Sequence, residues 1–162
     1  MLTITQAERV FRLKIAIGAD HGGYQLKNLI VPFIQSLGHE VEDVGCTCEQ
    51  SVDYPDYALP VGELVAGGKV DRGILICGTG IGMSIAANKV PGVRCALVND
   101  MFSAQATREH NDTNVLAMGE RVIGPGVAQE IVRIWLETPF SNGERHVGRL
   151  NKVKQIEKQF TV

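Results

Sequence analysis

The sequence lacks any long apolar run, and no stretch of it approaches the roughly 20 residues that a membrane-spanning helix needs. It also lacks an excess of either charge, since 16 Lys and Arg stand against 18 Asp and Glu, for a net charge of -2. A nearly neutral chain has no bulk electrostatic attraction to nucleic acid or to a membrane surface. We therefore expect neither as a partner.

Cysteine is scarce, and four thiols do not make a disulfide framework in a chain of 162 residues. Cys46 and Cys48 form a C-x-C, but no second Cys or His pair stands at zinc-finger spacing, so the sequence predicts no metal site. Residues 1–13 carry neither the apolar region nor the cleavage pattern of a secretory signal. We expect a cytoplasmic protein with an N-terminal extension, residues 1–13, ahead of one domain, residues 14–162.

Apolar strand-like segments alternate with amphipathic helical patterns along the whole domain. The alternation favours a parallel sheet covered on both faces, which is a three-layer α/β/α, Rossmann-like sandwich with five strands. The sequence leaves the strand order open. The expected strands lie near 13–17, 40–44, 74–76, 94–98 and 115–119. The expected helices lie near 24–37, 53–66, 83–88, 101–109, 126–137 and 150–160, with 138–148 as a connection.

Ligands of such sheets bind outside the carboxyl ends of the strands. The loops at those ends carry Asp20 and His21 after the first strand, Cys77 to Gly82 after the third, Asn99 and Asp100 after the fourth, and Arg121 after the fifth. We therefore expect these side chains around one crevice.

The glycine turn Gly78-Thr79-Gly80-Ile81-Gly82 stands between a strand and a helix start. Glycines let backbone N–H groups approach an oxyanion closely, and the helix dipole favours negative charge there. The Thr79 hydroxyl could donate to that oxyanion or relay a proton. The spacing is G-x-G-x-G, and no Lys-Ser/Thr follows, which disfavours a dinucleotide or P-loop site. A tight turn without a ligand is the alternative to an anion site.

Cys77 comes at the end of the third strand, directly before this turn. A helix N-terminus favours the thiolate, whereas an apolar wall disfavours it, so the sequence leaves the net effect open. A buried core cysteine is the alternative. Asp20 and His21 are either a functional pair at a strand end or a helix cap followed by a solvated histidine.

Two further polar groups come later in the chain. His110 and Asn111 follow the fourth helix, and a helix cap with loop residues is the alternative to a functional role. Arg145 and Arg149 flank His146, and forked guanidinium groups suit a phosphate, which Arg121 could also contact. A solvated basic face is the alternative.

These motifs together resemble the ribose-5-phosphate isomerase B family, over residues 14 to about 158. The motifs are Gly18–Gly23, Asp53–Pro55, Ile76–Gly82, Ala86–Lys89 and Glu109–Asn114. The resemblance implies a metal-free, cofactor-free aldose–ketose isomerase that interconverts D-ribose 5-phosphate and D-ribulose 5-phosphate through a cis-enediolate, in the pentose phosphate pathway. The wider family includes isomerases of allose 6-phosphate and galactose 6-phosphate, so a hexose phosphate remains an alternative substrate. A non-catalytic module that binds sugar phosphate is an alternative of another class.

The resemblance also implies roles for single residues. The residue matching Cys77 is the base that moves the proton between C1 and C2, and the one matching Thr79 helps to shuttle protons between the sugar oxygens. The residue matching His110 opens the furanose ring, while those matching Asp20 and Asn111 orient the sugar. The implied substrate-binding positions are His21, Tyr54, Gly78, Gly80, Ile81, Gly82, Arg121, Arg145 and Arg149.

Some bacterial relatives replace the cysteine and carry a glutamate base at the position of Met83. A methionine cannot take a proton, so the resemblance implies Cys77 as the base in this chain. Members of the family form dimers with shared active sites, in which the His110–Asn111 segment comes from the neighbour. We accordingly expect a homodimer, with a tetramer as the alternative.

Overall fold

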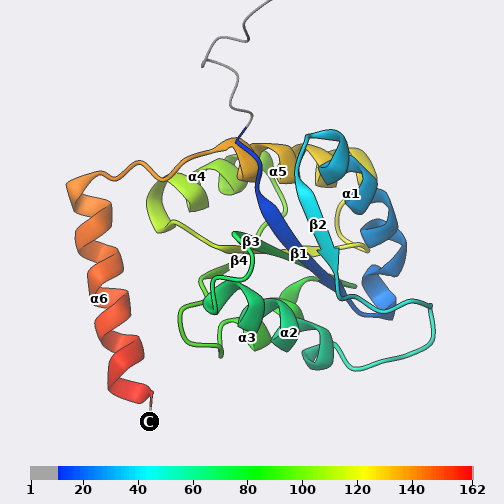
Figure 1. Ribbon diagram of the computed structural model, residues 1–162, viewed down its shortest axis with the longest axis horizontal. Coiled ribbons are helices and arrows are strands. Elements are labelled where there is room, and N and C mark those ends of the chain that lie inside the picture. The colour runs from blue at the N-terminus through cyan, green and yellow to red at the C-terminus, as the bar shows by residue number, and fades with distance from the viewer. Residues whose placement is uncertain (1–10, 162) are drawn as a thin grey trace, which may run out of the picture.

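The computed structural model describes residues 11–161, so most of the expected extension at 1–13 lies outside the described residues. Five strands alternate with helices (Figure 1), as the sequence predicts. None of the helices within residues 11–161 is both long and apolar enough to cross a membrane. The elements are β1 (Lys14–Ala19), the 3-10 helix η2 (His21–Gly23), α1 (Tyr24–Ser36), β2 (Glu40–Asp43), α2 (Pro55–Ala66), β3 (Arg72–Cys77), α3 (Ile81–Ala87), β4 (Cys95–Leu97), α4 (Met101–Asn111), β5 (Val115–Gly119), α5 (Pro125–Glu137) and α6 (Glu144–Phe160).

The five strands form one sheet in the order β2-β1-β3-β5-β4, and every pairing is parallel. In the register, Ile17 lies opposite Ile74, and Leu75 lies opposite Ala117. The central strands β3 and β5 are buried along their whole length, which explains their unbroken apolar runs. Because all strands point the same way, their carboxyl ends share one edge of the sheet.

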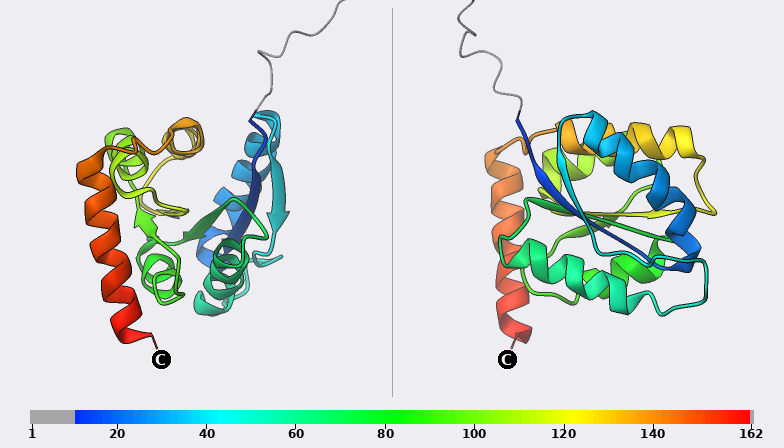
Figure 2. Two further views of the ribbon diagram at one scale, coloured as in Figure 1. Left: turned by 60° about the vertical axis from the view of Figure 1, so that its left-hand side comes forward. Right: turned by 45° about the vertical axis from the view of Figure 1, so that its right-hand side comes forward.

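Helices cover both faces of the sheet, and the two layers are visible in Figure 2. Buried residues of α1, α4 and α5, such as Ile30, pack with Ile74 and Ile76 of β3 on one face. Buried residues of α2 and α3, such as Met83, pack with Leu75 and Cys77 on the other. The alternation along β3 therefore directs the Cys77 side chain toward the layer of α2 and α3. The expected α/β/α sandwich is confirmed.

The last helix departs from the sequence prediction. A connection over 138–148 was expected, but α6 begins at Glu144, so Arg145 and His146 lie in its first turn. None of the 17 residues of α6 is buried, and the helix projects beside the sandwich (Figure 1). The presence of Gly148 suggested that no helix would include this position. A single glycine, however, destabilises a helix by only about 1 kcal/mol relative to alanine.

The start of α2 also differs in detail. Asp53 is a cap candidate by residue type, but Tyr54 is the N-cap residue and no side chain caps the helix there. Pro55 occupies the first turn, where a missing N–H costs nothing because that N–H would have no partner in the helix.

Candidate active site

Cys77 ends β3 at the carboxyl edge of the sheet, and only 5% of it is exposed. Its Sγ accepts a hydrogen bond of 3.1 Å from the N–H of Gly80. Gly80 has a φ of 77°, and a Cβ there would lie 2.5 Å from Leu97 Cδ1 and 2.8 Å from the carbonyl carbon of Met118. Only glycine adopts this φ readily and also fits in the space that a Cβ would need. Gly80 therefore lets the turn pack tightly over the sulfur.

The rest of the glycine turn is bracketed by two side chains. A Cβ on Gly82 would lie 2.8 Å from Tyr54 Cζ, so the tyrosine ring rests on that glycine. A Cβ on Gly78 would lie 3.2 Å from Arg121 Nη1, which places the guanidinium against the start of the turn. Thr79 is exposed, and its Oγ1 accepts the N–H of Ile81 at 3.3 Å, where α3 begins.

Asp20 and His21 lie beside this turn. The buried Asp20 carboxylate accepts the N–H of Gly22 at 2.9 Å, which is the capping geometry anticipated as an alternative. A Cβ on Gly22 would lie 3.0 Å from the backbone nitrogen of Gly78, so η2 approaches the glycine turn directly. His21 Nδ1 accepts the N–H of Val52 at 3.2 Å, which leaves the proton of the neutral ring on Nε2.

The structure thus brings six of the predicted side chains together, and we call them the carboxyl-edge cluster. Its members are Asp20, His21, Tyr54, Cys77, Thr79 and Arg121. The glycine-turn residues Gly78, Gly80, Ile81 and Gly82 form its floor.

His110 and Asn111 do not lie at this edge. They end α4, which starts after β4 at the carboxyl edge and runs 11 residues, about 16 Å, toward the opposite edge. There the ring of His110 stacks on that of His146 of α6, with centroids 4.4 Å apart and planes within 9°. Arg145 and Arg149 extend along the same exposed helix. We call His110, Asn111, Arg145, His146 and Arg149 the α4–α6 cluster.

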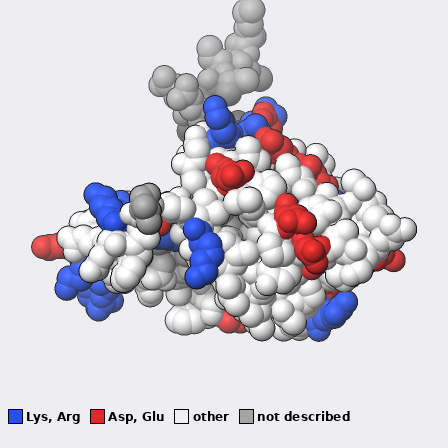
Figure 3. Space-filling view, turned by 90° about the horizontal axis from the view of Figure 1, so that it is seen from below, with Lys and Arg blue, Asp and Glu red and all other residues white. Residues whose placement is uncertain are grey.

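The α4–α6 cluster is basic. Desolvation lowers the pKa of His146 below its ordinary value, and the charges of His110, Arg145 and Arg149 lower it further. A groove of about 450 Å³ on α6 is lined by Arg145, Arg149 and Lys152, with Glu144 and Gly148. Figure 3 shows Lys and Arg side chains gathered on the lobe that projects at the left of the view. Guanidinium groups arranged in this way suit a phosphate.

The remaining cysteines are not part of a metal site in the described part of the chain. Within residues 11–161, no three His, Cys, Asp or Glu side chains are arranged to hold a metal ion. Cys46 Sγ donates to the carbonyl of Cys48 at 3.3 Å. Cys95 is half-buried in β4, and burial raises its pKa to about 12.

Sequence reasoning missed two supporting residues at the carboxyl edge. Glu120, next to Arg121, accepts the N–H of Leu26 at 2.8 Å and so caps the first turn of α1. The buried Lys27 Nζ donates to Asp43 at 2.7 Å and to the carbonyl of Cys46 at 3.0 Å, which ties down the loop after β2. Both contacts join segments far apart in the chain, and no local pattern signals them.

Comparison with known proteins identifies the family of the chain. A family model described as Ribose/Galactose Isomerase matches residues 15–153. Ribose-5-phosphate isomerase B of Escherichia coli is 49% identical over 146 residues, which cover 90% of this chain and 97% of that protein. D-erythrulose-4-phosphate isomerase of Pectobacterium atrosepticum is 46% identical over 146 residues, covering 89% and 93%. The solved structure of Clostridium thermocellum ribose-5-phosphate isomerase B has a TM-score of 0.89 at 53% identity, covering 91% and 99%. The chain therefore belongs to the ribose/galactose isomerase family and is a sugar phosphate isomerase.

Proposed function

We propose that the protein interconverts D-ribose 5-phosphate and D-ribulose 5-phosphate through a cis-enediolate, with Cys77 as the base. The observation that carries the proposal is the Cys77 sulfur held against the glycine turn at the edge where ligands of parallel sheets bind. Relatives and structural neighbours named ribose-5-phosphate isomerase B support the choice of substrate.

In this mechanism the Cys77 thiolate takes the proton from C2 of the open-chain aldose and returns it to C1, which gives the ketose. Thr79 carries the hydroxyl proton from O2 to O1, so the reaction needs no external proton donor. The first-turn amides of α3, including that of Gly82, have no acceptor within the helix and can bind the enediolate oxygen. One well-placed donor of this kind contributes about 3 to 4 kcal/mol.

The proposal further requires a second chain. The carboxyl-edge cluster and the α4–α6 cluster lie at opposite edges of the sheet, so one chain cannot place both around one sugar. In a two-fold dimer, each α4–α6 cluster would face the carboxyl-edge cluster of its partner. His110 would then open the furanose ring, Asp20 and Asn111 would orient the sugar, and Arg145 and Arg149 would hold the phosphate.

The exposed apolar surface supports this dimer. The helix α6 has no buried residue, and Val153 and Ile156 line an open groove of about 530 Å³ beside β4 and α4. Ile85 and Phe102 are also more than half exposed. An open apolar groove of this kind is typical of a surface that a partner covers.

Complementation between two inactive variants tests the shared site. Cys77→Ala and His110→Ala should each be inactive alone, because each removes one half of every site. After the two are unfolded together and refolded, half of the dimers are mixed and one of the two sites in each is intact. About one quarter of the wild-type activity should then return. If the mixture stays inactive while each variant is dimeric, the shared site is refuted.

A comparison of substrates tests the rest of the proposal. We expect kcat/KM to be highest for ribose 5-phosphate and unchanged by EDTA. A preference for allose 6-phosphate, or for D-erythrulose 4-phosphate as the name of one relative suggests, would mean that the proposed substrate is wrong. The proposed isomerisation chemistry would still stand. A non-catalytic binder would leave C1 and C2 of the bound sugar unlabelled in deuterium oxide.

A further inference from the structure

A further cavity lies at the edge of the sheet opposite Cys77. Its volume is about 590 Å³, within the usual range for sites of small organic ligands. Leu37, Leu136, Pro139 and Phe140 give it apolar walls. The other lining residues are Phe11, His39, Arg72, Arg108, Glu137 and Thr138.

Arg72 opens β3 and is only 9% exposed. Its Nη1 donates to the carbonyls of Trp135 and Leu136, at 2.6 and 3.1 Å, and its guanidinium lies 5.2 Å from the centre of the Trp135 ring. Nε and Nη2 have no partner among the described residues. Every fully buried side-chain nitrogen in residues 11–161 has a partner, so these two donors are accessible to solvent, and Arg72 lines the cavity.

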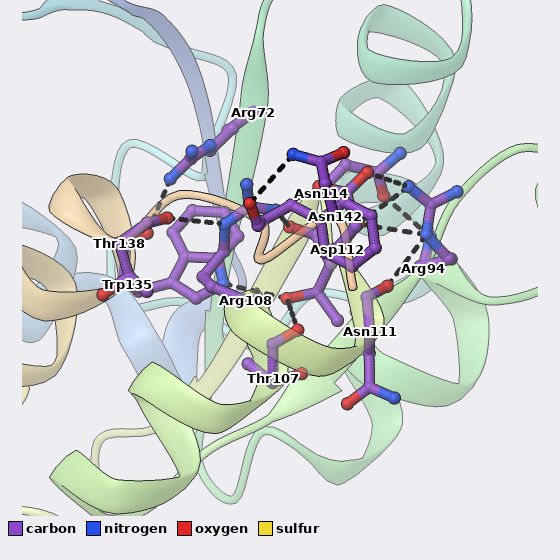
Figure 4. Close-up of polar contacts among 12 residues, drawn as sticks. Arg72, Arg94, Thr107, Arg108, Asn111, Asp112, Asn114, Trp135, Thr138 and Asn142 are labelled. Atoms are coloured by element: carbon purple, nitrogen blue, oxygen red, sulfur yellow. Dashed lines mark hydrogen bonds and ion pairs between the residues drawn. The ribbon is translucent and has the colours of Figure 1, made fainter. Parts of the chain in front are cut away.

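Arg108 of α4 approaches the same wall and is 6% exposed. Its Nη1 binds Asp112 at 2.9 Å and the carbonyl of Thr113 at 2.6 Å, and its Nε binds the carbonyl of Thr138 at 3.3 Å. No described residue accepts from its Nη2. Figure 4 shows Arg72 and Arg108 both reaching the segment that carries Trp135 and Thr138.

The positive charge of this cavity is incompletely balanced. Burial and the neighbouring Arg108 lower the pKa of Arg72 to about 10. Asp112 pairs with Arg108, but Arg94 shares that carboxylate at 3.2 Å. Glu137, at the rim, already pairs with Arg133. An anion in the cavity would supply the missing charge.

His39 adds a neutral donor to the two arginines. Its Nδ1 accepts the N–H of Leu13 at 3.2 Å, so the proton of the neutral ring is on Nε2. Burial and the charge of Arg72 lower the pKa of His39, which keeps the ring neutral near pH 7.

We propose that this cavity binds an organic anion whose carboxylate or phosphate head meets Arg72 and Arg108 while its apolar body lies along Leu136 and Phe140. The fork of a guanidinium matches either head, and the apolar walls exclude a bare sugar phosphate as the preferred ligand. The site differs from the candidate active site in position and in lining, and it does not depend on the proposed function.

The emission of Trp135 reports binding directly, because this residue is the only tryptophan and its ring stacks on Arg72. The probes are octanoate, octyl phosphate and the uncharged octanamide, titrated against the full chain. We expect saturable emission changes with octanoate or octyl phosphate, the tighter of which identifies the head. Octanamide should bind at least about tenfold more weakly than that probe. Equal binding of the charged and uncharged probes, or no binding of either anion, would overturn the proposal.

A variant that places a carboxylate in the cavity wall gives a sharper test than a variant that removes a buried arginine. Phe140→Glu leaves Arg72 and Arg108 intact and supplies a competing anion from an irregular segment. It should weaken binding of the charged probe at least about tenfold. The matched control is Leu59→Glu on the exposed side of α2, which should bind as wild type does. Wild-type binding by Phe140→Glu would place the anion elsewhere and contradict the proposal.

Discussion

Substitution of Gly80 by alanine tests the geometry of the turn that holds Cys77. Its φ of 77° costs an alanine about 1 to 2 kcal/mol, since a Cβ crowds the backbone in this region. The new Cβ would also meet Leu97 Cδ1 at 2.5 Å and the backbone of Met118 at 2.8 Å. Overpacking against a backbone that cannot yield costs a further 1 to 3 kcal/mol or so. The free energy of unfolding should therefore fall by about 2 to 5 kcal/mol.

Gly68→Ala provides the matched control. Gly68 also has a positive φ, of 66°, but no atom lies within 4 Å of its ideal Cβ. Both variants carry the same backbone strain, and both gain the same reduction in unfolded-chain entropy. Urea unfolding at equal protein concentration should thus separate them by about 1 to 3 kcal/mol. Equal midpoints would refute the packing argument. A shift of the turn by about 1 Å should also reduce kcat/KM roughly 100-fold in Gly80→Ala alone.

Two further predictions concern contacts outside the turn. Glu120→Ala should destabilise the protein by about 1 kcal/mol in urea because the N–H of Leu26 loses its cap, while Glu120→Gln keeps an acceptor and should lose less. His146 has a pKa below its ordinary value of 6.5, so the unfolded chain binds more protons than the folded one just below pH 6.5, and stability falls as the pH drops through that range. NMR titration should give His146 a pKa under 6.5, and His146→Asn should flatten the pH dependence; a higher pKa would contradict the stacked geometry.

Local signals sufficed for much of the fold. β5 was predicted at its observed limits because the apolar run from Val115 ends at a glycine. The strand β3 was predicted too short at its start. A charged residue such as Arg72 is an improbable strand residue by type, and carbonyls at the end of α5 stabilise it there. The strand order also depends on pairings between distant segments, which no local pattern encodes.

The candidate site, like the fold, could be predicted from the sequence only in part. Cys77 and Arg121 could be placed at one edge from the sequence, since both follow parallel strands. His110 could be identified as polar and exposed, but its stacking on His146 depends on where α6 begins. The sequence pattern placed that start several residues too late, so the two histidines were not expected to meet.

The most direct test of the central claim is the rate of isomerisation of ribose 5-phosphate by Cys77→Ser. Serine keeps an acceptor for the N–H of Gly80 and so preserves the turn, but its hydroxyl is a far weaker base than a thiolate. We expect kcat to fall by about 100- to 10,000-fold while KM changes little, because the phosphate and sugar contacts remain. A folded Cys77→Ser variant with wild-type kcat would show that the proton is moved by another group.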